Sequence, residues 1–207
     1  MKIKICGLTD IKEAAFLNKY PVDFAGMVLF YPKSRRNISA AQAKEIQKAL
    51  KPEIKTVAVT VSPDISQVKE IEEAGFDYLQ VHGHLPEGLF EETKIPVLKA
   101  FNISDLDSYR YYHDCPGIAG YVFDAQEPGS GKVFDWSLVK DIPKDEKLLL
   151  LAGGLNAANV AEAVRYVKPD GVDVSSGVEY EDGRGKDPQK IEAFVTAVVK
   201  AGSESYI

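Results

Sequence analysis

The sequence predicts an α/β protein built as a closed (β/α)8 TIM barrel. Short runs of β-branched and apolar residues alternate with longer amphipathic stretches along the chain, a pattern typical of a parallel sheet with crossover helices. Eight such units fit into 207 residues with no linker and no change of composition. We therefore expect one domain over residues 1–207, with a doubly wound open sheet as the alternative.

The strands are predicted where short apolar runs end at glycine, proline or polar residues. The fourth and fifth are the shortest, because Gly75 and Pro96 leave little room for them. The eight predicted segments are residues 2–6, 24–30, 56–61, 78–81, 97–101, 119–123, 148–152 and 171–174.

Helices are predicted between the strands, and three of them begin with a capping residue. Ser39 precedes a stretch that places Ala43 and Ile46 on one apolar face. Asp64 and Asn156 stand in the same position before the amphipathic stretches 65–74 and 157–167. Each short strand is therefore followed by a segment long enough to cross back over the sheet.

Composition and charge exclude several functional classes. The chain is 45% hydrophobic and 27% charged with a net charge of −6, and its acidic and basic residues are interspersed, which argues against sequence-independent nucleic acid binding. No apolar window is long enough for a membrane span, so we expect a cytoplasmic protein that does not contact membranes. Cys6 and Cys115 are too few for a disulfide framework or a cysteine-rich zinc site, and each is expected to be a free thiol.

Polar residues follow the predicted strands at the points where the strands end. Cys6 ends the first strand, Arg36 follows the second, His82 the fourth and Asp124 the sixth. The carboxyl ends of barrel strands meet at one face, where such enzymes hold their active sites. These side chains are therefore expected to converge.

Glycine and serine after the last two strands suggest a phosphate site. Gly154 follows the seventh strand, and Ser176 and Gly177 follow the eighth. Glycine lets the backbone approach an anion, and barrels frequently bind phosphate with these two loops. The alternative is that the glycines only make tight turns.

A glycine-rich loop after the sixth strand does not indicate an ATPase. The segment 129–132 reads GSGK, but a valine follows the lysine and the earlier glycine of a P-loop is missing. We interpret it as a flexible loop that closes over the site beside Asp124.

Cys6 and Asp124 form a candidate acid–base pair. Each has a structural alternative, since a cysteine at a strand end is often a small buried hydrophobe and an aspartate often caps a turn. Together, at the mouth of one barrel, a thiolate can accept a proton and a carboxylic acid can give one. That role requires the pKa of Asp124 to rise in a dry pocket and the pKa of Cys6 to fall beside positive charge.

Six motifs in order give the chain a family resemblance. KICGLT, AGMVLFYPKSRRNIS, QVHG, FDAQEPGSGKVFDW, LAGGLNAANV and DVSSGVEYEDGRGKDPQKI together resemble phosphoribosylanthranilate isomerase of tryptophan biosynthesis. The match runs from Lys4 to Ile191, nearly the whole chain. The resemblance implies a barrel of the ribulose-phosphate-binding type that performs an Amadori rearrangement without metal or cofactor.

The resemblance also implies roles for individual residues. Asp124 is expected to be the general acid and Cys6 the general base in converting N-(5'-phosphoribosyl)anthranilate to 1-(2-carboxyphenylamino)-1-deoxyribulose 5-phosphate. Arg36 is expected to bind the anthranilate carboxylate, whereas Arg35 is interpreted as a solvated loop charge. Because the family often has proline at the position of Arg35, an offset of one residue between the two arginines stays open. Gly154, Ser176 and Gly177 are the expected phosphate ligands. His82 and Asp173 match family positions near the substrate, and a purely structural hydrogen bond is the alternative for both.

Two rival functions stay open at this stage. Another phosphosugar barrel enzyme would share the phosphate site, and the indole-forming synthase among them would need lysine instead of the Cys6 and Asp124 pair. A non-catalytic phosphometabolite-binding module is the alternative from another class. The expected partner is a small phosphosugar, and the chain is expected to be a monomer or a homodimer.

Overall fold

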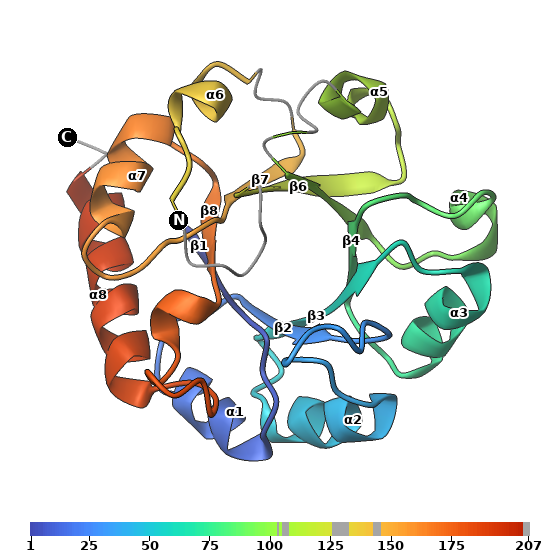
Figure 1. Ribbon diagram of the computed structural model, residues 1–207, viewed down its shortest axis with the longest axis horizontal. Coiled ribbons are helices and arrows are strands. Elements are labelled where there is room, and N and C mark those ends of the chain that lie inside the picture. The colour runs from blue at the N-terminus through green and yellow to red at the C-terminus, as the bar shows by residue number, and fades with distance from the viewer. Residues whose placement is uncertain (103, 105–107, 126–132, 143–145, 205–207) are drawn as a thin grey trace.

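Eight parallel strands close into a barrel. The computed structural model describes residues 1–102, 104, 108–125, 133–142 and 146–204. Each strand pairs with the next one along the chain, and β8 returns to pair with β1 (Figure 1), so Lys2 lies opposite Gly171 and Ile5 opposite Val174. The predicted (β/α)8 barrel is confirmed, and the open doubly wound sheet is excluded.

All eight strands lie where the sequence predicts them, and their ends differ by no more than two residues. The second strand ends two residues early, because Phe30 takes a positive φ of 57° that a strand does not accommodate. The observed strands are β1 Lys2–Cys6, β2 Phe24–Val28, β3 Lys55–Val61, β4 Tyr78–His82, β5 Val97–Asn102, β6 Ile118–Asp124, β7 Leu148–Leu151 and β8 Gly171–Val174.

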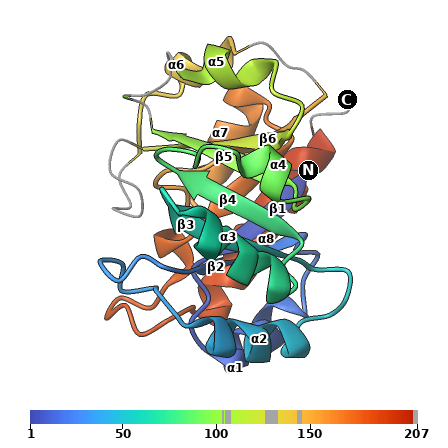
Figure 2. The same ribbon diagram turned by 90° about the vertical axis from the view of Figure 1, so that its right-hand side faces the viewer.

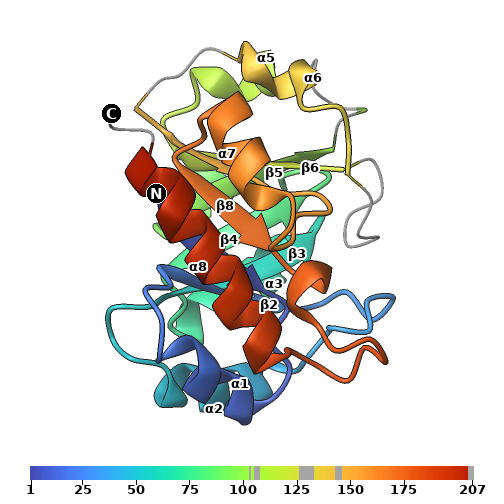
Figure 3. The same cartoon turned by 90° about the vertical axis from the view of Figure 1, so that its left-hand side faces the viewer.

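Helices surround the barrel, and several are a single turn long. The helices are α1 Ile11–Leu17, α2 Ala40–Ala49, α3 Ile65–Glu73, α4 Leu89–Glu92, α5 Tyr109–His113, α6 Ser137–Lys140, α7 Val160–Val167 and α8 Pro188–Glu204, with the 3-10 turn η2 at Ser176–Val178. The long helix α8 packs beside α7 and α1 (Figure 3). In the described part of the chain, no helix has the length and apolar character needed to cross a membrane.

Two of the three predicted caps are observed. Ser39 and Asp64 each accept a hydrogen bond from the backbone at the third helical residue, and that residue's glutamine returns a bond, which completes a capping box. The prediction for Asn156 was wrong, because α7 begins only after Asn159. Instead, Asn156 accepts a bond from the amide of Ala158 at 2.9 Å and thereby holds the turn that precedes the helix.

The barrel interior changes character along its axis. An apolar cluster fills part of it and contains Phe24, Val57, Val59, Leu98, Ala100, Val122, Leu150 and Ala152. Toward the carboxyl ends, the inward positions become polar and include Cys6, His82, Asn102 and Asp124. A second, larger apolar cluster lies between the sheet and the helices. The apolar interior therefore closes the bottom of a polar site at the carboxyl ends of the strands.

Two chain segments project from the same end of the barrel. They are the loop after β2 and the segment that follows β8 (Figures 2 and 3). Ion pairs of Arg35 and Arg36 with Glu179 join these two segments. They form one wall at the carboxyl ends of the strands.

Candidate active site

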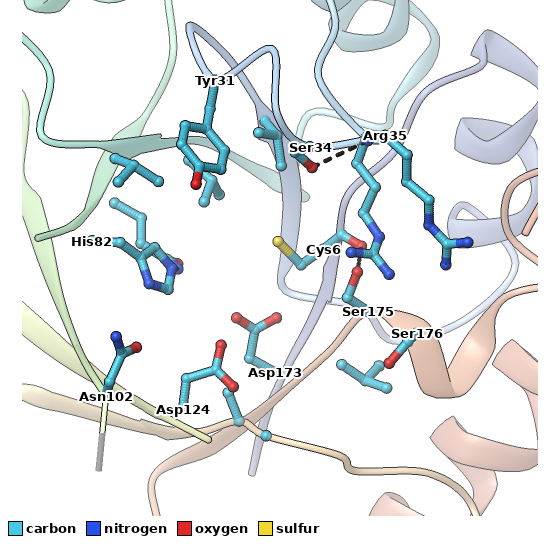
Figure 4. A pocket seen from close by; sticks show the side chains of 18 of the residues that line it. Cys6, Tyr31, Ser34, Arg35, His82, Asn102, Asp124, Asp173, Ser175 and Ser176 are labelled. Carbon is cyan, nitrogen blue, oxygen red and sulfur yellow. Dashed lines mark hydrogen bonds between the residues drawn. The ribbon is translucent and has the colours of Figure 1, made fainter. Parts of the chain in front are cut away.

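A cavity of about 700 Å³ opens at the carboxyl ends of the strands, and most of the predicted site residues line it. Figure 4 shows Cys6, His82, Asp124 and Asp173 around the same central space. The lining includes the predicted site residues Cys6, Arg36, His82, Asp124, Gly154, Asp173 and Ser176. The convergence that the strand ends predicted is therefore observed.

Strand β1 places the Cys6 thiol, and Gly26 on the neighbouring strand makes room for it. Cys6 pairs in register with Gly26 of β2, where an added Cβ would lie 2.8 Å from Sγ. Gly7 follows Cys6 with a φ of 81°, which favours glycine, and its open side is filled by the Arg36 stem, whose Cδ would lie 2.5 Å from a Cβ at Gly7. The local sequence thus fixes a thiol at the mouth of the barrel.

A buried lysine lies beneath the thiol. Lys4 precedes Cys6 by two residues on β1, so both side chains point into the barrel. Lys4 is fully buried, and its Nζ donates to Asp173 Oδ2 at 2.6 Å. Asp173 Oδ1 is buried without a hydrogen-bond partner among the described residues, so it is left for a ligand. Sequence reasoning missed Lys4, although the alternation of β1 was sufficient to place it.

Burial raises the pKa of the Cys6 thiol above its ordinary value, and this outweighs the cations Lys4 and Lys186, which lower it. The negative charge of Asp173 adds to the rise. The expectation that positive charge would depress this pKa was wrong, because desolvation is the larger effect. The thiol is therefore mostly protonated at neutral pH.

Asp124 ends β6 and faces the same cavity. Its Oδ1 accepts a hydrogen bond from the backbone amide of Ala125 at 2.7 Å. Burial raises the pKa of Asp124 to about 6, helped by the charge of Asp173 and opposed by Lys4 and Arg36. The rise that general-acid chemistry requires is present, and a fraction of Asp124 carries a proton at neutral pH.

His82 ends β4 on the opposite wall from Cys6 and is a neutral group. Its Nε2 lies 2.9 Å from Nε2 of Gln80. Burial, with smaller contributions from the cations Lys4 and Lys99, lowers the pKa of His82 to about 3. At neutral pH this imidazole can exchange hydrogen bonds with a ligand but does not supply charge.

Arg36 lines the cavity from the loop after β2, and Glu179 holds it. Its Nε and Nη2 donate to the two carboxylate oxygens of Glu179 at 2.6 and 3.0 Å. Arg35 also pairs with Glu179, although its own side chain is 56% exposed. The interpretation of Arg35 as a purely solvated charge was therefore incomplete.

The residues predicted to bind phosphate lie together in the segments that follow β7 and β8. Gly153 and Gly154 both have positive φ, at 81° and 65°, so both favour glycine. Gly154 and Ser176 line both the main cavity and an adjoining one of about 490 Å³. Gly177 lines only the adjoining cavity. A Cβ at Gly177 would lie 2.0 Å from the carbonyl oxygen of Leu155, so only glycine lets these two loops meet.

Other features were missed or lie outside the described structure. Glu179 was quoted within a motif but given no role, because its partner Arg36 lies 143 residues away, and Lys186 was not singled out. The loop 129–132 falls outside the described residues. Among the residues that are described, no group of His, Cys, Asp and Glu side chains is arranged to hold a metal ion.

The cysteines lie at opposite ends of the barrel. Cys6 ends β1, whereas Cys115 precedes β6, and both are free thiols. The carbonyl oxygen of Cys115 accepts a hydrogen bond from Lys147 Nζ at 2.8 Å. Cys115 therefore has a structural environment and no contact with the cavity.

Comparison with known proteins agrees with this geometry. The family model described as N-(5'phosphoribosyl)anthranilate (PRA) isomerase matches residues 3–197. The N-(5'-phosphoribosyl)anthranilate isomerases of Geotalea daltonii and Aquifex aeolicus are 39% and 37% identical, over 94% of this chain and 94% and 97% of theirs. The crystal structure of the Thermotoga maritima enzyme has a TM-score of 0.85 at 32% identity, covering 97% of this chain and 99% of that one. The chain therefore belongs to the N-(5'-phosphoribosyl)anthranilate isomerase family.

Proposed function

We propose that this isomerase uses Cys6 as its general base and Asp124 as its general acid. The observation that carries the proposal is their shared cavity, which they reach from β1 and β6. The pKa of about 6 at Asp124 supports the acid role, because a carboxyl group buried in this way can hold a proton near neutral pH. The substrate is N-(5'-phosphoribosyl)anthranilate, a small phosphosugar.

The reaction divides between the two groups. Asp124 protonates the ring oxygen of the ribose as its bond to C1 breaks, and the nitrogen lone pair forms the C1–N double bond of a Schiff base. Cys6 as thiolate removes the proton from C2, and the released electron pair forms the enolamine. Tautomerisation gives the aminoketone 1-(2-carboxyphenylamino)-1-deoxyribulose 5-phosphate. After these two proton transfers Asp124 is a carboxylate and Cys6 is a thiol, which is the reverse of the protonation states in which the reaction began.

Substrate binding uses the two walls of the cavity. We assign the anthranilate carboxylate to Arg36, and the phosphate to Gly154, Ser176 and Gly177, where glycines let the backbone come close to an anion. A related solved structure, with a TM-score of 0.80 and 32% identity, is a complex with reduced 1-(o-carboxyphenylamino)-1-deoxyribulose 5-phosphate. A ligand of that class carries an anion at each end.

His82 and Asp173 are assigned to the sugar between these anions. Both line the cavity, and Asp173 Oδ1 is a buried acceptor with no partner among the described residues. A sugar hydroxyl or the anthranilate N–H would supply the missing donor. This assignment goes beyond a structural hydrogen bond, because the second oxygen of Asp173 is already satisfied by Lys4.

The remaining expectations concern the setting of the enzyme. We propose a cytoplasmic enzyme that acts as a monomer or a homodimer. One related structure is of monomers generated from the dimeric Thermotoga maritima isomerase, with a TM-score of 0.81. Neither state changes the chemistry proposed here, because every assigned residue comes from one chain.

The test measures loss of phosphoribosylanthranilate, formed in situ from anthranilate and phosphoribosyl pyrophosphate. Wild type is compared with Cys6→Ser and Asp124→Asn, and we expect each variant to lose about 10² or more in kcat. Cys115→Ser is the matched control and should keep wild-type turnover. If Cys6→Ser or Asp124→Asn turns over at the wild-type rate, the assigned role is wrong. A wild type that binds the phosphosugar without turnover would favour the binding-module alternative.

A further inference from the structure

We propose that Glu179 is a positioning residue that orients Arg36 to receive the anthranilate carboxylate. The inference rests on the proposed function, since it assumes that Arg36 meets that carboxylate. Glu179 lies after β8, about 140 residues along the chain from Arg36, and does not line the main cavity itself. It acts on the ligand only through the arginine.

The geometry of the pair leaves one edge of the guanidinium for a ligand. Glu179 takes the Nε and Nη2 edge of Arg36 with both of its oxygens, at 2.6 and 3.0 Å. A guanidinium is planar and has a second edge, formed by Nη1 and the other N–H of Nη2, that can bind another carboxylate in bidentate fashion. Among the described residues, no hydrogen bond uses this second edge. Because Arg36 lines the cavity, its pairing with Glu179 fixes where a ligand carboxylate can bind.

Glu179 is itself held rigidly. Its side chain is 5% exposed, and Lys186 Nζ, which is fully buried, donates to Oε1 at 2.9 Å. The backbones of Glu179 and Lys186 also form an antiparallel bridge. The amide of Lys186 donates to Glu13 Oε1 at 2.7 Å, which ties this segment to α1. Four hydrogen bonds from Arg35, Arg36 and Lys186 therefore converge on the Glu179 carboxylate, and a fifth holds the backbone of Lys186.

The same network reaches the catalytic strand. Lys186 Nζ also lies 3.3 Å from Ser175 Oγ, and that hydroxyl donates to the carbonyl oxygen of Cys6 at 2.9 Å. The stem of Arg36 packs over Gly7, the residue after Cys6. The position of the arginine is therefore set relative to the thiol and not only relative to its own loop.

The charges of the cluster favour an incoming anion. Glu179 is surrounded by Arg35, Arg36 and Lys186, so one negative charge meets three positive ones. Although burial alone would raise the pKa of Glu179, Arg36 and Lys186 lower it to about 2, so the carboxylate stays ionised at working pH. A benzoate carboxylate at Arg36 would bring a second negative charge to this group of cations.

The test compares two ligands in calorimetric titrations at pH 7.5. One is reduced 1-(o-carboxyphenylamino)-1-deoxyribulose 5-phosphate, and the other is the same molecule without the ring carboxylate. In Glu179→Gln we expect Kd for the first to rise by about tenfold or more, and Kd for the second to change by less than about twofold, because only the first meets Arg36. Glu179→Asp keeps the charge and should recover part of the loss. Glu45→Gln, which breaks an exposed ion pair with Lys48, is the control.

The outcomes separate this inference from the proposed function. Equal loss of both ligands in Glu179→Gln means a structural role and overturns the inference, and so does unchanged binding of both. If Glu179→Gln does not fold, Glu179→Asp decides by the same comparison, with a carboxylate-specific loss supporting the inference and an equal loss or none overturning it. A wild type that binds the two ligands equally refutes the role of Arg36, and one that binds neither refutes the proposed function.

Discussion

Cys6 and Asp124 favour the protonation states opposite to those that the proposed mechanism uses. The pKa of Asp124 is about 6 and that of Cys6 lies above its ordinary value, so at pH 7 most molecules hold a thiol and a carboxylate. The fraction of molecules that hold a Cys6 thiolate together with a protonated Asp124 is small, and it does not change with pH between the two pKa values. We therefore expect a plateau in log kcat/KM from about pH 6 to the thiol pKa, with a decline on each side.

Asp124→Asn tests this arrangement at the residue scale. Without a carboxyl group to titrate, only ionisation of Cys6 governs the remaining activity. We expect the low residual kcat/KM of the variant to rise about tenfold per pH unit between pH 6 and 8, where wild type is flat. Steady-state rates across that range check it. A flat profile in the variant would show that Cys6 is not the titrating base.

The same substitution changes stability in a pH-dependent way. The folded-state pKa of Asp124 is raised by burial, so the ionised side chain disfavours folding. The penalty is absent below the unfolded pKa near 3.9, grows as pH rises and is complete above about 6. Asp124→Asn should therefore be more stable than wild type by about 3 kcal/mol at pH 8 and nearly equal to it near pH 4. Urea unfolding at the two pH values measures this, and an equal difference at both would contradict it.

At the scale of elements, β1 and β2 act together to hold the thiol. Gly26 lies beside Cys6, and a methyl group there would come within 2.8 Å of Sγ and 3.1 Å of the Cys6 Cα. We expect Gly26→Ala to displace Cys6 and to lower kcat by about tenfold or more, because the proton transfer depends on its position. Gly202→Ala, on α8 with its closest contact at 3.3 Å to Met1, is the control and should keep wild-type kcat. Unchanged kcat in Gly26→Ala would mean that the strands relax around the methyl group.

The sequence was most informative about elements whose signals are local. Ser39 and Asp64 cap their helices as expected, since a cap and the residue it bonds lie within one turn. The end of β2 was misjudged because an apolar Phe30 conceals a left-handed backbone. Asn156 resembles a cap but bonds within a turn four residues before α7 begins, and the residue types alone do not distinguish the two arrangements.

At the scale of the whole molecule, closure of the barrel creates contacts that local patterns do not contain. The convergence of Cys6 and Asp124 followed from the alternation of strands and helices, and family motifs added Arg36. Lys4 meets Asp173 across 169 residues and Glu179 meets Arg36 across 143, so neither pair has a local signal. The pKa of Cys6 was misjudged for the same reason, because burial depends on how the closed barrel excludes water.

The pair of Lys4 and Asp173 lies at the seam where the first strand meets the last. Both side chains are buried, and the Nζ to Oδ2 distance is 2.6 Å. Removing one partner leaves the other charged in a dry interior, so Lys4→Met and Asp173→Leu should each lower the free energy of unfolding by about 3–5 kcal/mol. The double variant leaves no unpaired charge and should recover most of that loss while remaining inactive, because the site loses its acceptor. Urea unfolding of the four proteins gives the coupling energy. Additive losses in the double variant would show that the seam is held by packing between β1 and β8 and that the ion pair serves the site alone.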